Sequence, residues 1–307
     1  MVPGTPSITH GTVGKRASRD AVIGLVTYSK QPVLTDDDRP LIGAFAEIGL
    51  EAEPVQWDDA GVDWREYDAL VLRSTWDYHL RVSEFERWLS LLDRERVPLW
   101  NPTAVVRWNM HKGYLQGLQQ AGILIPGTRW LPRGRAVALG GLLAGATWTE
   151  AIVKPAISAS ATKTSLVHID SPADAERFAA LLGEGDVLVQ EVVPEVARDG
   201  EWSLMFIGAS YSHAVLKKPR PGDFRVQQEL GGTADPATAP SVVIAAAERV
   251  AAQIPGRWLY ARIDGVVTER GFMLMEAECI EPLLFFEYAS GAYERFASAL
   301  QALIAGK

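Results

Sequence analysis

The stretch that most limits how this chain can fold is 260–281, YARIDGVVTERGFMLMEAECIE. Two runs of alternating side chains flank the loop Glu269-Arg270-Gly271. This pattern predicts a β-hairpin with a three-residue loop, in which Gly takes the place that needs a left-handed backbone. Because the side chains of a strand alternate between its faces, the loop also fixes which residues share a face.

Four charged side chains share one face of this hairpin. A register centred on Arg270 sets Asp264 opposite Glu276 and Arg262 opposite Glu278, about 4.5–5.5 Å apart at Cβ. Three carboxylates this close repel one another unless a cation joins them, and a single Arg cannot balance all three. Mg²⁺ takes oxygen ligands from carboxylates and nucleotide phosphates. The face therefore predicts a metal–nucleotide platform, and a solvent-exposed face with an ordinary salt bridge is the alternative.

The opposite face of the hairpin is apolar, and we expect it to lie in a core. It carries Ile263, Val267, Met273, Met275, Ala277 and Cys279. We expect Cys279 to be a buried thiol. As the chain's one cysteine it excludes an intramolecular disulfide and a multi-cysteine zinc site, which, together with the lack of a signal peptide, favours a cytoplasmic protein.

Length and charge exclude other classes of protein. A chain of 307 residues suits two or three packed units. The net charge of −8 argues against a nucleic-acid partner, because affinity for phosphate backbones rests on clustered Lys and Arg. No segment has eighteen uninterrupted apolar residues, so we expect no membrane partner. Residues 1–20 have no apolar run and predict a disordered leader.

The N-terminal part predicts a small α/β layer with a parallel sheet. Strands are expected at 21–28, 68–72 and 97–100, and a helix at 38–48 with Asp36 or Asp37 as its cap. A second helix is expected to start at the capping box Ser83-Glu84-Phe85-Glu86 and to bury Phe85, Trp88, Leu89 and Leu92. Ligands of such layers bind beyond the carboxyl ends of the strands. The loop 73–78, RSTWDY, is therefore either a substrate edge, with Trp76 and Tyr78 lining a small pocket, or a polar loop with an aromatic plug.

The rest of the chain predicts a second and a third sheet. After a helix at 111–121, strands are expected at 127–131, 150–154 and 187–190, and a helix begins with Ser171 as N-cap and Pro172 at its first position. Loop 157–164 is made of small hydroxyl residues and is either a mobile lid or a plain surface loop. Farther on, strands 202–207 and 210–216 pair across Gly208-Ala209, and helices span 240–254 and 288–304.

Several short sequence motifs follow one another along the chain in a characteristic order. They are Lys112, Lys154-Pro155, the small-residue loop, Gln190-Glu191, Gly200-Glu201, a basic strand with Lys217, Arg262-Ile263-Asp264 and Glu276-x-Glu278. In this order they resemble the ATP-grasp superfamily from about residue 21 to the end. RSTWDY, GDFRVQ (222–227) and MEAECIEP (275–282) are most similar to the group that includes D-cycloserine synthetase and the ribosomal-protein glutamate ligases.

The resemblance implies a fold and a division into domains. The fold is α/β and α+β: an N-terminal parallel α/β layer, a small central lid domain and a C-terminal antiparallel sheet. The implied domains are 21–110 on the substrate side, 111–193 with the lid, and 194–307 with the metal site. Many members of the superfamily form dimers, so a homodimer is an open expectation.

The resemblance also assigns roles to residues. Lys112 and Lys154 match the lysines that contact the nucleotide phosphates, although an isolated lysine such as Lys154 is more often solvated. Gln190, Glu191 and Val193 match the hinge that holds adenine. Glu201 matches the acceptor for the ribose hydroxyls. Loop 158–164 matches the phosphate-covering lid, where the family usually has Gly.

The remaining roles concern the reacting groups. Lys217 matches the grip on the terminal phosphate, Arg225 a substrate or phosphate contact, and Arg262 the group that stabilises charge at the reacting carbonyl. Asp264, Glu276 and Glu278 match the Mg²⁺ ligands, although many relatives have Asn where this chain has Glu278. ATP and Mg²⁺ are the implied cofactors, with Mn²⁺ as an alternative ion.

The implied reaction is ATP-dependent and ADP-forming. A small, amino-acid-like carboxylate is activated as an acyl phosphate and captured by an amine. One alternative is ATP-driven ring closure within a single amino-acid derivative, as in D-cycloserine synthesis. Another is a non-catalytic nucleotide-binding protein, against which the complete set of site charges argues.

Overall fold

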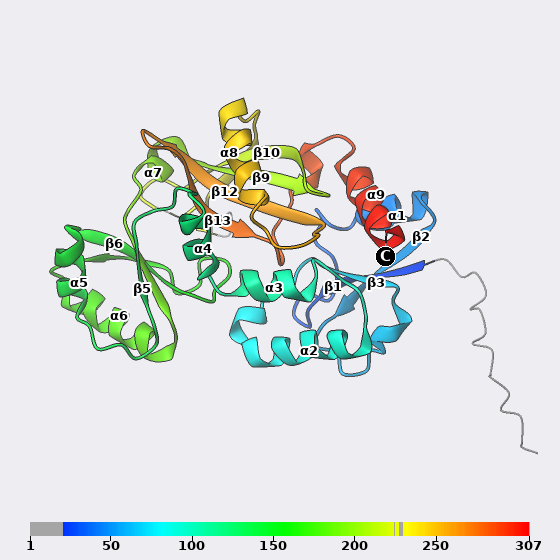
Figure 1. Cartoon of the computed structure of the whole chain (residues 1–307), viewed down its shortest axis with the longest axis horizontal. Coiled ribbons are helices and arrows are strands. Elements are labelled where there is room, and N and C mark those ends of the chain that lie inside the picture. Colours follow the sequence, from blue (N-terminus) through cyan, green and yellow to red (C-terminus); the bar gives the residue numbers. More distant parts are fainter. Residues whose placement is uncertain (1–20, 224, 227–229, 307) are drawn as a thin grey trace, which may run out of the picture.

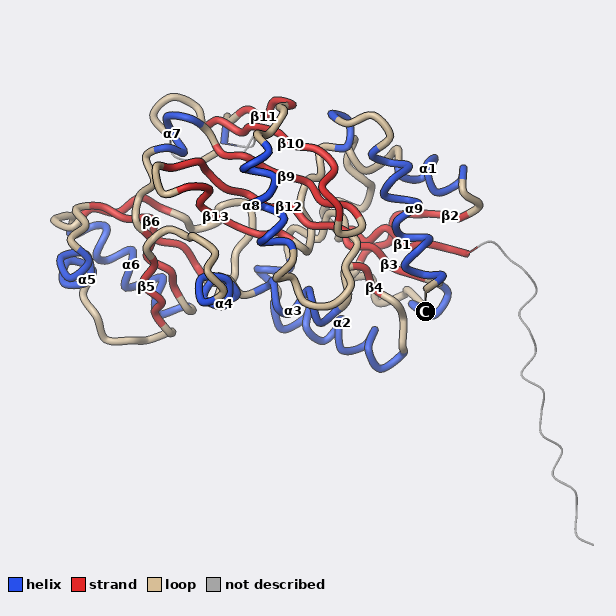
Figure 2. The backbone as a smooth tube through the Cα atoms, turned by 45° about the horizontal axis from the view of Figure 1, so that its top comes forward, coloured by secondary structure: helices blue, strands red, loops and turns tan. Residues whose placement is uncertain are grey.

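The computed structural model describes residues 21–223, 225–226 and 230–306, so the leader predicted for 1–20 lies outside the described residues. The chain forms three sheets (Figures 1 and 2), one within each of the three ranges predicted as domains. The division into domains itself stays a prediction. None of the described helices combines the length and the apolar character that crossing a membrane requires.

The N-terminal sheet is parallel, as the sequence predicts. Its strands β1 (Ala21–Thr27), β2 (Leu50–Gln56), β3 (Ala69–Leu72) and β4 (Leu99–Trp100) pair in the order β2-β1-β3-β4. Residues that alternate along β1 and β3 face two different cores: Leu25 and Val71 lie in one, Val26 and Leu70 in the other. Because both faces are covered, these strands read as continuous apolar runs.

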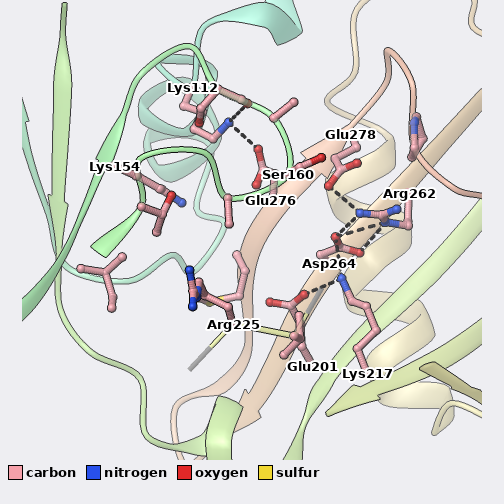
Figure 3. A pocket seen from close by; sticks show the side chains of 18 of the residues that line it. Lys112, Lys154, Ser160, Glu201, Lys217, Arg225, Arg262, Asp264, Glu276 and Glu278 are labelled. Atoms are coloured by element: carbon pink, nitrogen blue, oxygen red, sulfur yellow. Dashed lines mark hydrogen bonds and ion pairs between the residues drawn. The ribbon is translucent and has the colours of Figure 1, made fainter. Parts of the chain in front are cut away.

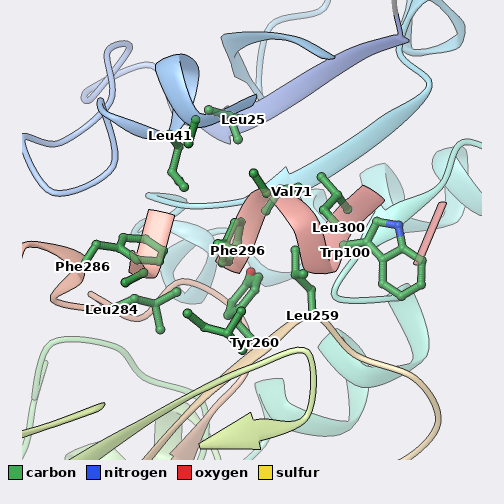
Figure 4. Close-up of a cluster of buried hydrophobic side chains, with 14 of the residues drawn as sticks. Leu25, Leu41, Val71, Trp100, Leu259, Tyr260, Leu284, Phe286, Phe296 and Leu300 are labelled. Atoms are coloured by element: carbon green, nitrogen blue, oxygen red, sulfur yellow. The ribbon is translucent and has the colours of Figure 1, made fainter. Parts of the chain in front are cut away.

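Helices cover both faces of this sheet. On one face lie α1 (Leu41–Glu47) and the C-terminal α9 (Ala292–Ala305), and on the other α2 (Val82–Glu95), with α3 (Thr103–Met110) beside it. Short 3₁₀ turns lie at Trp64–Glu66, Tyr78–Leu80 and Phe286–Tyr288. Phe296 of α9 packs edge-on against Phe45 of α1, with ring centroids 6.4 Å apart. Figure 4 shows how this core joins the two ends of the chain, with α9 side chains set between the N-terminal sheet and Tyr260.

The helix starts differ from the predicted ones. α1 begins after Pro40 without a side-chain cap, so neither Asp36 nor Asp37 caps it. α2 is preceded by Arg81 and has no side-chain cap, so the predicted capping box Ser83-Glu84-Phe85-Glu86 lies inside the helix and does not cap it. The predicted apolar spacing is confirmed, because Phe85, Trp88, Leu89 and Leu92 are all buried. Burial of this face therefore outweighs capping in placing the helix.

The helix predicted at 111–121 is confirmed over most of its length, but its predicted start is wrong. A break at 111–113 separates α3 from α4 (Tyr114–Gln120). His111 has an extended backbone, and the Lys112 N–H donates to Ala156 O at 2.7 Å instead of to a carbonyl within a helix. Lys112 thus lies in a turn tied to the central segment.

The central sheet is antiparallel, in the order β5-β8-β6-β7. Its strands are β5 (Thr128–Leu131), β6 (Glu150–Pro155), β7 (Ser165–His168) and β8 (Val187–Gln190), and it is joined by α5 (Leu139–Ala146) and α6 (Pro172–Glu184). Ser171 is the N-cap of α6, as predicted: its hydroxyl accepts the Asp174 N–H at 3.2 Å, and Pro172 is the first helical residue. The predicted strands 127–131, 150–154 and 187–190 are confirmed, while β7 and α5 add to the predicted set.

The C-terminal sheet is antiparallel and follows the order β11-β10-β9-β12-β13. Its strands are β9 (Glu201–Ile207), β10 (Ser210–Lys218), β11 (Thr233–Pro236), β12 (Tyr260–Thr268) and β13 (Gly271–Glu278), with α7 (Glu195–Asp199) and α8 (Ser241–Ala251) packed beside them. β9 and β10 pair across Gly208-Ala209, as predicted.

The β12–β13 hairpin has the predicted pairs but a different register near its turn. Thr268 lies opposite Gly271, so the loop has two residues rather than three, although Gly271 does have a positive φ of 110°. A β-bulge at Met275 inserts one residue into β13 and restores the pairs of Arg262 with Glu278 and Asp264 with Glu276.

The bulge corrects the predicted apolar face. Ile263, Ala277 and Cys279 lie in the expected core, but Leu274 joins them instead of Met273 and Met275. These two methionines contact a separate cluster with Val266 on the charged side of the sheet, and Val267 is 43% exposed. The added residue shifts the alternation of side chains along β13 by one position. The β13 side chains between the bulge and the turn therefore lie on the face opposite the predicted one.

Candidate active site

One cavity lies where the three sheets meet, and every site residue predicted from the sequence lines it (Figure 3). These residues are Lys112, Lys154, Gln190, Glu191, Val193, Glu201, Lys217, Arg225, Arg262, Asp264, Glu276 and Glu278. Their proximity is an observation, whereas their individual roles stay predictions.

The sheet supplies the charged floor of the cavity. Cross-strand register sets Lys217 opposite Glu201 and Asp264 opposite Ser203, so one face of β10, β9, β12 and β13 carries a continuous row of polar groups. Lys217 lies 2.7 Å from Glu201 and 3.1 Å from Asp264. Burial raises the pKa of Glu201 more than the nearby Lys217 ammonium lowers it.

Asp264 is the most strongly held carboxylate of the row. It accepts hydrogen bonds from Ser203 Oγ at 2.5 Å and from Arg262 Nη2 at 3.0 Å. Burial opposes its ionisation, but the charges of Arg262 and Lys217 outweigh burial and lower the pKa of Asp264 to about 2. Asp264 is therefore ionised at neutral pH.

Arg262 bridges Asp264 to Glu278, whose carboxylate is 2.5 Å away. Burial, together with Asp264 and Glu276, raises the pKa of Glu278 to about 7, although Arg262 counteracts this effect. Arg262 also donates to Leu283 O at 3.1 Å, which leaves its guanidinium fixed in the cavity wall. Without a ligand, this one Arg is shared by two carboxylates.

Lys112 and Glu276 form the opposite wall. Lys112 Nζ lies 2.8 Å from Glu276 and donates to Ser158 O at 2.8 Å. Burial raises the pKa of Glu276, but Lys112 and Lys154 outweigh it and lower the pKa overall. Burial lowers the pKa of Lys154, and its partly exposed ammonium has no hydrogen bond or ion pair within the described part of the chain. An ammonium that lines a cavity without a partner favours an anionic ligand.

The predicted hinge is partly occupied by protein contacts. Gln190 donates to Thr128 Oγ1, and the Glu191 N–H donates to Gly127 O at 2.8 Å. The Glu191 carboxylate accepts from Gly127 N at 2.9 Å and from Arg270 at 2.7 Å. The Glu191 C=O and the Val193 N–H remain as the backbone groups that an adenine edge would meet, since neither has a hydrogen bond among the described residues.

Arg225 is held by its neighbour Asp223 through two hydrogen bonds of 2.9 and 3.0 Å. Phe224 and Gln227 of the GDFRVQ motif lie outside the described residues. Across the cavity, loop 158–164 adopts left-handed backbone at Ser160, Ala161 and Lys163, with φ of 50°, 52° and 57°. Gly takes such φ values without cost, which explains how this loop resembles a Gly-rich one without containing Gly.

One residue of the RSTWDY loop is structural, and two others line the cavity. Arg73 is fully buried and pairs with Asp38 at 2.8 Å, so it is a structural residue. Trp76 and Tyr78 line the cavity. Sequence reasoning missed Glu281, which also lines the cavity three residues beyond Glu278. It lies outside β13, so strand alternation gave no signal, and its position after the acidic motif was the one available clue.

The donor chemistry of Asp264, Glu276 and Glu278 fits Mg²⁺, which prefers carboxylate oxygens. Among the described residues, however, no three His, Cys or acidic groups are gathered around a common point. The reason lies in the ion pairs, because Lys112, Lys217 and Arg262 hold the carboxylates apart. Binding of an ion would require these pairs to rearrange.

Comparisons with known proteins agree with this geometry. The N-terminal domain of D-cycloserine synthetase DcsG matches residues 23–101. The cycloserine biosynthesis protein DcsG of Streptomyces lavendulae is 31% identical to this chain over 299 residues, which cover 91% of this chain and 97% of that protein. The chain belongs to the ATP-grasp ligases. Family membership makes it an ATP-dependent, ADP-forming carbon–nitrogen ligase and sets aside the alternative of a non-catalytic protein.

Solved ATP-grasp structures share its fold. The crystal structure of D-cycloserine synthetase DcsG superposes with a TM-score of 0.80 at 29% identity and covers 92% of this chain and 100% of that one. A D-alanine–D-alanine ligase from Bacillus anthracis, in complex with ATP, superposes with a TM-score of 0.66 at 14% identity and covers 94% and 98% of the two chains. The predicted fold class is confirmed.

Proposed function

We propose that this ATP-grasp ligase activates the carboxylate of a small amino-acid-like substrate as an acyl phosphate, which a nitrogen nucleophile then captures. The observation that carries the proposal is the meeting of four cations with three acidic strand residues in one cavity. The cations are Lys112, Lys154, Lys217 and Arg262, and the acids are Asp264, Glu276 and Glu278. Transfer of a phosphoryl group asks mainly for positioning and charge neutralisation, and this inventory supplies both.

Nucleotide binding would exchange one set of ion pairs for another. Triphosphate oxygens would compete with Glu276 for Lys112, and Lys154 has no carboxylate to give up. The freed Glu276 would join Asp264 and Glu278 as ligands of Mg²⁺, which neutralises phosphate charge when it is bound. The Glu191 C=O and Val193 N–H would meet adenine, and Glu201 the ribose hydroxyls.

The two chemical steps balance without a further reactant. A carboxylate oxygen of the substrate attacks the γ-phosphorus, and the bond from that phosphorus to the bridging oxygen breaks, which releases ADP. The nitrogen then attacks the acyl carbon, the bond from carbon to the phosphate oxygen breaks, and the nitrogen loses a proton. Arg262 would stabilise the oxyanion of this second step by about 3 kcal/mol, the scale of one oxyanion donor.

Ring closure within one amino-acid derivative is the second candidate. It is favoured by the similarity to D-cycloserine synthetase DcsG, which extends over the full length of that chain. The two candidates differ in product mass: joining adds a second molecule to the activated acid, whereas ring closure does not. Mass spectrometry of a reaction with one substrate and Mg-ATP separates them.

The metal and phosphate roles are tested by two variants. We expect Asp264→Asn and Glu276→Gln to lose at least 100-fold in the rate of ADP release, because each removes an ionised ligand from the phosphoryl-transfer site. Circular dichroism should show an unchanged fold. Near-normal turnover in either variant would contradict the metal assignment.

A further inference from the structure

Glu281 differs from the other carboxylates that line the cavity. Glu191, Glu201, Asp264, Glu276 and Glu278 each accept a hydrogen bond or form an ion pair. For the Glu281 carboxylate, the described part of the chain provides neither. The Glu281 side chain is partly exposed and lines the cavity, so a positively charged group of a ligand can reach its carboxylate oxygens.

The backbone that carries Glu281 is fixed. Seven successive carbonyl groups, from Cys279 to Phe285, lie within hydrogen-bond distance of side chains, and Phe285 O also accepts the Tyr288 N–H at 3.1 Å. In order, the side chains are Asn101 at 2.7 Å, Tyr260 at 2.6 Å, Trp76 at 3.2 Å, Arg73 at 3.0 Å, Arg262 at 3.1 Å, and His213 at 2.9 and 3.0 Å. Segment 279–285 is therefore held like an element of secondary structure, although it is irregular, and Glu281 is held with it.

Both apolar and charged side chains share the cavity with Glu281. Trp76, whose indole donates to Glu281 O, and Tyr78 line the cavity from the N-terminal layer, and Leu283 and Phe285 line it from the segment itself. The nearby cations, Lys112 and Arg262, form ion pairs with Glu276, Asp264 and Glu278 instead. A carboxylate that lies beside other carboxylates and has no cation of its own is a suitable site for a compact organic cation.

We propose that Glu281 binds the ammonium group of the amino-acid-like substrate and so selects acids that carry a primary amine. The inference rests on the proposed function, because it assigns a subsite within the same cavity. Trp76 and the fixed carbonyl groups of 279–285 position Glu281. Glu281 does not bind metal in this account, and it takes no part in phosphoryl transfer.

The test compares amino-bearing acids with matched acids that lack the amino group, such as D-serine and O-substituted D-serines against 3-hydroxypropionate and its O-substituted forms. ADP release from Mg-ATP is measured for the wild-type protein, Glu281→Gln, Glu281→Asp and the control Glu287→Gln. Glu287 belongs to the same region of chain but is exposed. Thermal unfolding checks that each variant is folded, and the shorter but still charged Asp keeps the test informative if Gln impairs folding.

We expect Glu281→Gln to raise KM for the amino-bearing acid at least tenfold and to abolish the preference over the matched acid. KM for ATP and the Mg²⁺ concentration for half-maximal rate should stay unchanged. Glu281→Asp should show an intermediate effect, and Glu287→Gln none.

Four results would overturn the inference. A preference retained in Glu281→Gln, or no preference in the wild type, would remove the ammonium role while leaving the ligase chemistry intact. A raised Mg²⁺ requirement without a change in substrate preference would make Glu281 a metal ligand. ADP release with no acid at all would contradict the proposed function, and the inference would fall with it.

Discussion

Asp37 is a partly buried carboxylate outside the cavity, next to the buried pair of Asp38 and Arg73. Burial and the Asp38 charge raise its pKa from 3.8 to about 6, and Arg73 and the backbone of residues 286 and 287 offset only part of the rise. The folded state thus binds the Asp37 proton more tightly than the unfolded state does. The free energy of unfolding therefore falls as pH rises from about 4 to about 6.

Asp37→Asn should remove this pH dependence. At pH 7 we expect the variant to be more stable than the wild type by about 1–3 kcal/mol, and at pH 4 about equally stable. Urea unfolding at pH 4, 5, 6 and 7 measures the difference. A constant gap between the two proteins across this range would show that the carboxylate does not titrate as described.

Replacement of Lys154 by an uncharged residue should stabilise the protein but weaken its binding of ATP. The Lys154 ammonium lies in the cavity without an ion pair among the described residues, so Lys154→Met should raise the melting temperature by a few degrees and raise KM for ATP at least tenfold. Lys218→Met is the control, because Lys218 is an exposed lysine at the end of strand β10 that does not line the cavity. An unchanged KM for ATP in Lys154→Met would remove Lys154 from the phosphate site.

At the scale of elements, the bulge in β13 sets Glu276 opposite Asp264 and Glu278 opposite Arg262. Next to it, Gly265 lies opposite Leu274, and an added Cβ would come within 2.3 Å of Phe272 Cζ and 2.7 Å of Met273 O. Gly265→Ala should cost about 1–3 kcal/mol of stability and lower activity, because one contact is backbone and cannot move away.

A helix glycine provides the matched control for Gly265→Ala. Gly43 lies in α1 with open space around its Cβ position, so Gly43→Ala should stabilise the protein by about 0.5–1 kcal/mol. Denaturant unfolding measures both variants. Equal effects of the two substitutions would mean that the hairpin tolerates a Cβ at residue 265.

The bulge itself could not be predicted from the sequence. Period-two alternation predicted the pairs of Arg262 with Glu278 and Asp264 with Glu276, but it placed Met273 and Met275 in the wrong cluster. A methionine is equally suited to both faces, so nothing in the sequence signalled the added residue. The break at Lys112 was missed for a similar reason, because its hydrogen bond to Ala156 is a long-range contact.

At the scale of the whole molecule, the buried pair of Arg73 and Asp38 joins the two ends of the chain. Arg73 donates to Pro282 O and lies over the rings of Tyr260, Phe286 and Phe296, at 5.2, 5.8 and 5.9 Å from their centroids. Its contacts thus connect the N-terminal sheet to segment 279–285.

Removal of one partner of this pair should be costly. Asp38→Leu leaves a buried guanidinium without its anion, and we expect a loss of about 3–5 kcal/mol. The double variant Asp38→Leu with Arg73→Met should recover part of the loss, since no buried charge remains. A double variant less stable than the single one would indicate that the contacts of Arg73 with Pro282 and the rings outweigh its ion pair.

The order of the motifs along the chain predicted the fold class, and the predicted site residues line one cavity, although their roles stay predictions. Cross-strand register explains why those on β9, β10, β12 and β13 lie close together. Glu281 and the fixed segment around it were not predictable, since an irregular backbone held by side chains from both ends of the molecule has no local signature.

The proposed activation of a carboxylate by phosphoryl transfer from ATP can be followed through the oxygen atoms of the substrate. Its most direct test is a reaction of the wild-type protein with Mg-ATP and amino-acid derivatives labelled with ¹⁸O in the carboxylate, with Asp264→Asn as the blank. Activation as an acyl phosphate predicts one ¹⁸O in each phosphate released, because one carboxylate oxygen leaves with the phosphate. Release of unlabelled phosphate during product formation would contradict the account.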